Sequence, residues 1–139
     1  MDVSFLRFRS YFSLLQGCRS PEEICSFAGQ KGSSRVVMAD VNNFYGLIRF
    51  LQAARREGVA PVAAVTVERK GRDLFSAYVL ERRGFSRICG LLTALLTDSE
   101  GEWDPVEDLR DKGWEGLAVL SRRPEVLSRL AGGGSGMRG

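Results

Sequence analysis

The stretch RVVMADVNNFYGLIRFLQAARREGVAPVAAVTV, residues 35–67, indicates the fold class of this chain. Its apolar run at 35–39 is typical of a strand buried on both faces. Apolar side chains at helical spacing follow over 44–57, and Gly58 ends this predicted helix. A second apolar strand is expected at 61–67. This order predicts two parallel strands joined by a helix, with any ligand site at the carboxyl ends of the strands.

The same alternation continues on both sides of this stretch. A strand is expected at 3–8, and Ser20 followed by Pro21 is typical of a helix start. The turn at 69–73 predicts a β-hairpin that leads into a returning strand at 74–80. Further elements are expected as a helix at 84–96, a helix from the cap Asp104 to about Lys112, a strand at 117–120 and a helix at 124–130.

These elements predict an α/β domain with a mainly parallel sheet and one β-hairpin over residues 1–131. A flexible Gly-rich tail is expected at 132–139. The helix at 44–57 is expected to bury one apolar face, made of Phe44, Leu47, Ile48, Leu51 and Ala54.

Composition excludes several kinds of chemistry. The 139 residues contain no histidine, so the chain itself cannot build a His-based triad or a His-containing metal site. The cysteines Cys18, Cys25 and Cys89 have no CxxC spacing, which favours reduced thiols over disulfides or a zinc ribbon. No apolar stretch approaches the ~20 residues of a membrane span, and the start does not resemble a secretory signal. A cytoplasmic location without membrane contact is therefore expected.

The charge is unevenly distributed along the chain. The net charge is +3 in total, but residues 98–115 contain eight acidic residues against Arg110 and Lys112. Residues 1–97 contain fourteen Lys and Arg against eight Asp and Glu. A basic body with an acidic segment could attract nucleic acid, whereas a mixed, solvated surface gives the same count.

Residues 7–17, RFRSYFSLLQG, resemble the opening of a PHP (polymerase and histidinol phosphatase) domain, as in the α subunit of bacterial DNA polymerase III. That opening normally reads His-x-His-Ser, then an aromatic residue with Ser-x-Leu, then Gly. Residues 39–46, ADVNNFYG, resemble the second motif, Thr-Asp-His-x-Asn-x-x-Gly, and residues 61–66, PVAAVT, the third, Pro-x-x-Gly-x-Glu. The similarity extends over about residues 5–121.

The resemblance implies part of a (β/α) barrel, because a complete PHP domain is a distorted seven-stranded barrel about twice as long. Active members hold metals at the carboxyl face and hydrolyse phosphoesters. Here the two first-motif histidines are Arg7 and Arg9, the second-motif histidine is Val41 beside a retained Asp40, and the third-motif glutamate is Thr66. Arginine has no lone pair to offer a metal. We therefore expect no bound metal, no cofactor and no catalytic residues.

Two roles are open for Arg7 and Arg9. Their alternation on one strand could direct both guanidinium groups into the former metal pocket, where they could bind an anion. They could equally pair with Asp40 and fill the pocket as a salt-bridged plug. Ser10 and Ser13 have no visible base that would make them nucleophiles.

Three functions follow from these residues. The first is a catalytically inactive domain with a structural or partner-binding role in DNA replication or repair, associated with polymerase subunits or with itself because a half barrel exposes sheet edges. The second is a metal-dependent phosphoesterase with a site rebuilt around Asp40 and Glu68. The third is a DNA-binding accessory module that uses Arg7, Arg9, Arg55, Arg56, Arg69 and Arg72.

Overall fold

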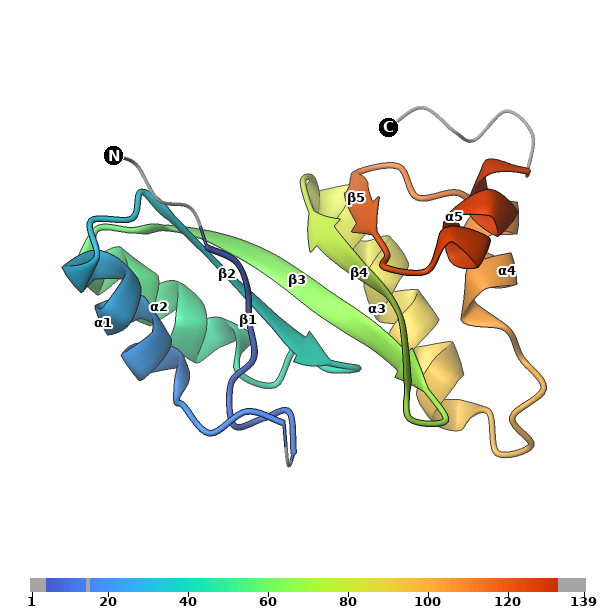
Figure 1. Ribbon diagram of the computed structural model, residues 1–139, viewed down its shortest axis with the longest axis horizontal. Coiled ribbons are helices and arrows are strands. Elements are labelled where there is room, and N and C mark those ends of the chain that lie inside the picture. Colours follow the sequence, from blue (N-terminus) through green and yellow to red (C-terminus); the bar gives the residue numbers. More distant parts are fainter. Residues whose placement is uncertain (1–4, 15, 133–139) are drawn as a thin grey trace. The chain divides into compact units, whose positions relative to one another are not determined.

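The computed structural model describes residues 5–14 and 16–132 (Figure 1). The chain divides into two compact units, Met1–Thr66 and Val67–Gly139, and each is described by itself. The single domain expected over residues 1–131 stays a prediction. Apart from Gly132, the expected tail at 132–139 lies outside the described residues, as do Val3 and Ser4 of the expected first strand.

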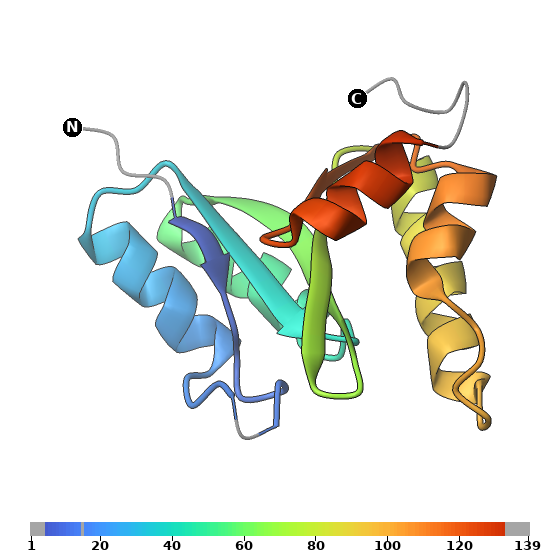
Figure 2. The same cartoon turned by 45° about the vertical axis from the view of Figure 1, so that its right-hand side comes forward.

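The first unit is the parallel strand–helix–strand arrangement predicted from residues 35–67. Strands β1 (Phe5–Phe8) and β2 (Arg35–Val41) are parallel, and β2 is parallel to β3 (Ala60–Arg69), whose last residues enter the second unit. Helix α1 (Pro21–Gln30) connects β1 to β2, and α2 (Leu47–Glu57) connects β2 to β3. Figures 1 and 2 show α1 and α2 side by side against these strands.

Local chemistry fixes the helix ends in this unit. The Ser20 hydroxyl accepts a hydrogen bond from the Glu23 N–H at 3.1 Å, and Pro21 occupies the first turn of α1. Gly58 ends α2 at φ 67°, a left-handed conformation that costs glycine little. Both ends confirm positions that the sequence predicts.

The core of the first unit lies between the two helices and β2. Burial of the Phe50 ring contributes about 1.5–3 kcal/mol by itself. The same core encloses Cys25, and burial raises the pKa of its thiol to about 11, so the group stays protonated near neutral pH. The buried cluster consists of Ile24, Cys25, Ala28, Val36, Met38, Phe50, Ala53, Ala54 and Val59.

Helix α2 differs from the prediction in its start and in part of its buried face, since Ala54 is buried as expected. It begins at Leu47 rather than Phe44. Ile48 and Leu51, expected in the core, are 66% and 38% exposed, whereas Phe50 and Ala53 are buried. The stretch carries apolar residues on both faces, so its periodicity does not select one. The face with the aromatic ring and the small alanine side chain is the one that packs.

The second unit begins with the end of β3, which turns through Lys70 and Gly71 into β4 (Arg72–Val79). β3 and β4 are hydrogen-bonded neighbours, so the predicted hairpin is confirmed. β4 also pairs antiparallel with β5 (Leu117–Leu120). The helices are α3 (Arg82–Thr97), α4 (Pro105–Lys112) and α5 (Pro124–Ala131).

A close backbone approach joins α3 to the segment before β5. A Cβ on Gly84 would lie 2.1 Å from the Gly116 carbonyl oxygen, so only glycine fits at position 84. Helix α4 begins where predicted, because the Asp104 carboxylate accepts hydrogen bonds from the backbone N–H groups of Val106 and Glu107. Within residues 5–14 and 16–132, no helix is both long and apolar enough to cross a membrane.

Candidate functional site

Asp40 lies at the carboxyl end of β2 and is only 2% exposed. Its Oδ1 accepts hydrogen bonds from the Ser10 backbone N–H and the Ser13 hydroxyl, both at 2.6 Å. Its Oδ2 accepts from the Ser10 hydroxyl, also at 2.6 Å. Two neutral side chains and one backbone group thus satisfy both oxygens of a buried carboxylate.

The two serines also hold the backbone around them. The Ser13 hydroxyl oxygen accepts from the Val41 N–H at 2.9 Å, and the Ser10 hydroxyl oxygen accepts from the Phe12 N–H at 3.2 Å. Each serine therefore donates to Asp40 and accepts from the backbone. The resulting network ties the loop after β1 to the end of β2. We call Ser10, Ser13 and Asp40 the buried serine–aspartate network.

The other positions that the resemblance matches to metal ligands are occupied by Arg7, Arg9, Val41 and Thr66. Arg9 donates to the side-chain oxygen of Gln16, and the side chain of Arg7 lies outside the described residues. Val41 is half-buried, and the fully buried Thr66 donates to the Ala39 carbonyl at 3.4 Å.

The metal that the family resemblance implies does not fit these residues. Each Asp40 oxygen is already occupied by short hydrogen bonds, and Val41 offers an apolar side chain. Within the described part of the chain, no group of three or more His, Cys, Asp or Glu residues is placed to hold a metal ion. Glu68, the alternative ligand considered from the sequence, lies two residues past Thr66 in the second unit and stays a prediction.

Two glycines in the family-like motifs allow the loop after β1 to close. A Cβ on Gly17 would lie 2.1 Å from the Ser10 carbonyl oxygen. A Cβ on Gly46 would lie 2.8 Å from the Phe12 ring. Any larger residue at either position would push the loop away, and with it Ser10 and Ser13. The absence of a side chain at Gly17 and Gly46 therefore lets the loop hold Ser10 and Ser13 next to Asp40.

The two aromatic residues of the loop contact Arg49, with Tyr11 41% exposed and Phe12 half-buried. The Arg49 guanidinium lies 5.4 Å from the Tyr11 ring centre and 5.7 Å from that of Phe12. Arg49 also pairs with Glu22 at 2.8 Å, and this hydrogen bond lowers the pKa of that carboxyl. Asn43 donates to the Phe12 and Val41 carbonyls at 3.2 and 2.8 Å, so it fixes the turn before α2.

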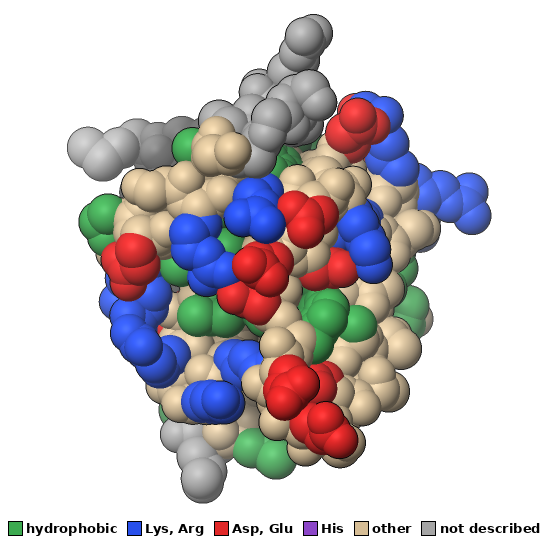
Figure 3. Space-filling model, turned by 90° about the vertical axis from the view of Figure 1, so that its right-hand side faces the viewer, with side chains coloured by type: hydrophobic (Ala, Val, Ile, Leu, Met, Phe, Trp, Pro, Cys, Tyr) green, Lys and Arg blue, Asp and Glu red, His purple; other side chains and the backbone are tan. Residues whose placement is uncertain are grey.

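In the second unit the acidic segment is neutralised by arginines of the same unit. Arg87 donates to the Asp108 carboxylate and to its backbone carbonyl, both at 2.8 Å. Arg69 pairs with Asp98 and also donates to the Trp103 carbonyl, so this arginine is not free for DNA. Figure 3 shows basic and acidic side chains interspersed on one face. Part of the uneven charge along the sequence is thus paired within the second unit.

Sequence reasoning identified Asp40 but not its partners. The structure brings Ser10 and Ser13 to Asp40, and the Val41 N–H donates to the Ser13 hydroxyl. One sequence signal could have predicted these partners. Ser10 and Ser13 follow the first predicted strand, and Asp40 lies at the end of the strand that is parallel to it. Such loops meet at one edge of a parallel sheet.

Comparison with known proteins places the sequence in a family. The PHP domain family matches residues 6–133. An error-prone DNA polymerase from Anaeromyxobacter sp. (strain K) is 35% identical over 95 residues, which cover 63% of this chain and 8% of the polymerase. A DNA polymerase III subunit alpha from Buchnera aphidicola subsp. Schizaphis graminum is 33% identical over 63 residues, covering 45% of this chain and 5% of the subunit.

Solved structures support a partial barrel. An amidohydrolase from Chromobacterium violaceum superposes with a TM-score of 0.54 at 19% identity, over 66% of this chain and 32% of that one. A structure from Bifidobacterium adolescentis, described as a metal-dependent phosphoesterase, gives a TM-score of 0.51 at 16% identity, over 63% and 30%. The chain spans 8% of the Anaeromyxobacter polymerase and about a third of the superposed chains. The chain belongs to the PHP domain family.

Proposed function

We propose that this chain is a PHP domain without phosphoesterase activity that has a structural or partner-binding role in DNA replication or repair. One observation carries this proposal: both oxygens of Asp40 are taken by Ser10 and Ser13. Asp40 is the one acidic residue kept at the family's motif positions described above.

A metal at Asp40 would have to displace those hydrogen bonds. Burying a polar donor without a partner costs about 1–3 kcal/mol, and the exchange would leave up to three such donors. A divalent ion also needs several oxygen or nitrogen ligands. Val41 and Thr66 stand where the family motifs have a histidine and a glutamate, and they do not supply an imidazole or a carboxylate. The network therefore favours a structural role for the carboxylate.

The partner-binding part of this function rests on relatives and on sheet edges. The similar proteins are error-prone DNA polymerases and DNA polymerase III alpha subunits. Strands β1 and β5 are the two ends of the strand order among described residues. An edge strand offers unpaired N–H and C=O groups to another chain. We infer a polymerase subunit or a second copy as the partner, in the cytoplasm.

Hydrolysis of bis(p-nitrophenyl) phosphate with Mn²⁺ or Zn²⁺ tests the loss of activity. The expected result is no rate above that of the metal alone. A Mn²⁺-dependent rate that Asp40→Ala abolishes would instead establish the rebuilt phosphoesterase. Glu68→Gln provides a second variant, because it removes the other ligand of that alternative without disturbing the buried network.

Association is tested by light scattering after size exclusion, with the chain alone and mixed with a C-family polymerase α subunit from the same genome. A dimer or a stable complex is the expected result. A monomer in both samples at micromolar concentration would contradict the partner-binding role.

A further inference from the structure

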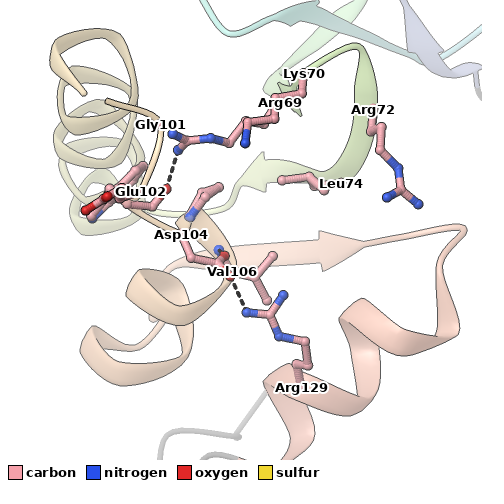
Figure 4. A pocket seen from close by; sticks show the side chains of 11 residues that line it. Arg69, Lys70, Arg72, Leu74, Gly101, Glu102, Asp104, Val106 and Arg129 are labelled. Atoms are coloured by element: carbon pink, nitrogen blue, oxygen red, sulfur yellow. Dashed lines mark hydrogen bonds and ion pairs between the residues drawn. The ribbon is translucent and has the colours of Figure 1, made fainter. Parts of the chain in front are cut away.

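The second unit contains a pocket of about 260 Å³ that is separate from the serine–aspartate network (Figure 4). The β3–β4 turn, the loop at 101–104, the start of α4 and Arg129 of α5 form its walls. Ligand pockets for drug-sized molecules span about 300–1,000 Å³. This pocket therefore suits one small group, such as a single phosphate with an attached ring.

Four cationic side chains line the pocket, and two of them are committed to internal partners. Arg69 pairs with Asp98, and Arg129 pairs with the N-cap carboxylate of Asp104. These pairs fix the walls and cancel much of the charge.

The remaining two cations are available to a ligand. Lys70 and Arg72 are exposed, and neither makes an ion pair within the part of the chain that the structure describes. Figure 4 shows the Glu102 side chain turned away from Arg72. Lys70 and Arg72 flank the tight turn at Gly71, so their backbone positions are fixed by the hairpin. Each of these two cations can therefore offer a charge-assisted contact to an anion in the pocket.

The pocket also has an apolar wall with a tryptophan. Leu74, the buried Val106 and Trp103 line it together. The backbone of Trp103 is held at both ends, because its N–H donates to Asp98 at 3.0 Å and its carbonyl accepts from Arg69. The Trp103 backbone is thus fixed at the pocket wall, where an indole ring can offer a stacking surface to a planar ring.

From this combination we propose that the pocket binds a nucleotide. Its phosphate contacts Lys70 and Arg72, and its base packs against Trp103. A free mononucleotide and the end of a single DNA strand present the same chemistry. This binding is independent of the function proposed for the chain, because it uses none of the residues around Asp40.

Fluorescence of Trp103 tests this proposal. The chain has two tryptophans, so Trp114→Phe leaves Trp103 as the sole reporter in the otherwise intact chain. Thymidine 5′-monophosphate, thymidine, inorganic phosphate and an octathymidylate are titrated separately. We expect saturable quenching by the monophosphate, competition by inorganic phosphate, and at least tenfold weaker binding of thymidine, because it lacks the charged group.

Variants separate this pocket from general charge attraction. Lys70→Ala and Arg72→Ala are each expected to weaken binding about tenfold. Arg82→Ala is the matched control, since Arg82 is exposed in the same unit but lies outside the pocket. Tighter binding of the octathymidylate than of the monophosphate assigns a strand end as ligand, and equal binding assigns a free nucleotide. Absence of saturable quenching, equal binding of thymidine, or equal losses in Arg72→Ala and Arg82→Ala would overturn the proposal.

Discussion

The two units each bury a carboxylate, and they satisfy it with different chemistry. In the first unit Asp40 is held by neutral donors, the Ser10 N–H and the hydroxyls of Ser10 and Ser13. In the second unit the side chain of Asp108 is 7% exposed and is held by the positive charges of Arg87 and Lys112.

A buried carboxylate can thus be stabilised either by neutral hydrogen-bond donors or by ion pairs. Neutral donors stabilise a buried carboxylate only while their hydrogen bonds are made, because such donors carry no full charge to offset its desolvation. Ion pairs that share one carboxylate with a solvated lysine tolerate the loss of one partner better. The first unit should therefore be sensitive to single changes at its network, and the second unit more tolerant.

The largest expected effect is that of Asp40→Ala. The change leaves the Ser10 and Ser13 donors buried without their acceptor, at a cost of about 3–5 kcal/mol in the free energy of unfolding. Urea denaturation measures this loss. Glu23→Gln, at an exposed position of the same unit, is the control and should change stability by less than about 0.5 kcal/mol. Equal effects of the two variants would contradict the stabilising role of the buried serine–aspartate network.

The next largest effect is expected for Gly17→Ala, which should lower the free energy of unfolding by about 1–3 kcal/mol. Its new Cβ would meet the Ser10 carbonyl oxygen at 2.1 Å and displace the serine loop. Gly90→Ala is the matched control: it lies inside α3 with no atom within 4 Å of a new Cβ, so alanine should stabilise the helix by up to about 1 kcal/mol. Thermal unfolding of both variants tests this: the melting temperature should fall for Gly17→Ala and should not fall for Gly90→Ala.

A pair of changes around Asp108 measures the tolerance of the second unit. Arg87, 18% exposed, also donates to the Gly113 carbonyl at 3.0 Å, so Arg87→Met should cost about 2 kcal/mol. Lys112 is 70% exposed, and Lys112→Met should cost less than about 0.5 kcal/mol. Urea denaturation measures both losses of unfolding free energy. A larger loss for Lys112→Met than for Arg87→Met would show that the exposed Lys112–Asp108 pair contributes more than the buried Arg87–Asp108 pair.

The mildest perturbation is a decrease in pH. The Arg69 hydrogen bond lowers the pKa of Asp98. Burial raises the pKa of Asp108, but hydrogen bonds from Lys112 and Arg87 outweigh it and leave that pKa lowered. Below pH about 4 the unfolded chain binds protons that these folded carboxylates do not, so their stabilisation is present above that pH and is lost as pH falls further. Unfolding measured from pH 7 to pH 3 should show a shallower acid decline for Arg87→Met.

Much of the fold could be predicted because its signals are local. The cap-and-proline starts at Ser20 and Asp104 and the short apolar run at 117–120 all form the expected elements. The buried face of α2 could not be predicted, because Ile48 and Phe50 are both apolar and only packing chooses between them.

The candidate site was predictable in part. The motif positions predicted both that Asp40 is a site residue and that the other metal ligands are absent, because this prediction needs only the residue type at each position. The bonds from Ser10 and Ser13 to Asp40 depend on which short side chains reach the carboxylate once the loop closes at Gly17. They are three-dimensional contacts between residues about thirty positions apart, as in the Ser10–Asp40 bond.

Metal content tests the central claim most directly. The chain is dialysed with Mn²⁺, Zn²⁺ or Fe²⁺, freed of unbound ion, and analysed for metal per chain, with Asp40→Asn in parallel. Because Asp40 is fully occupied by Ser10 and Ser13, the intact chain should retain far less than one ion, and Asp40→Asn should not change the amount. One or more ions per chain, lost in Asp40→Asn, would contradict this account.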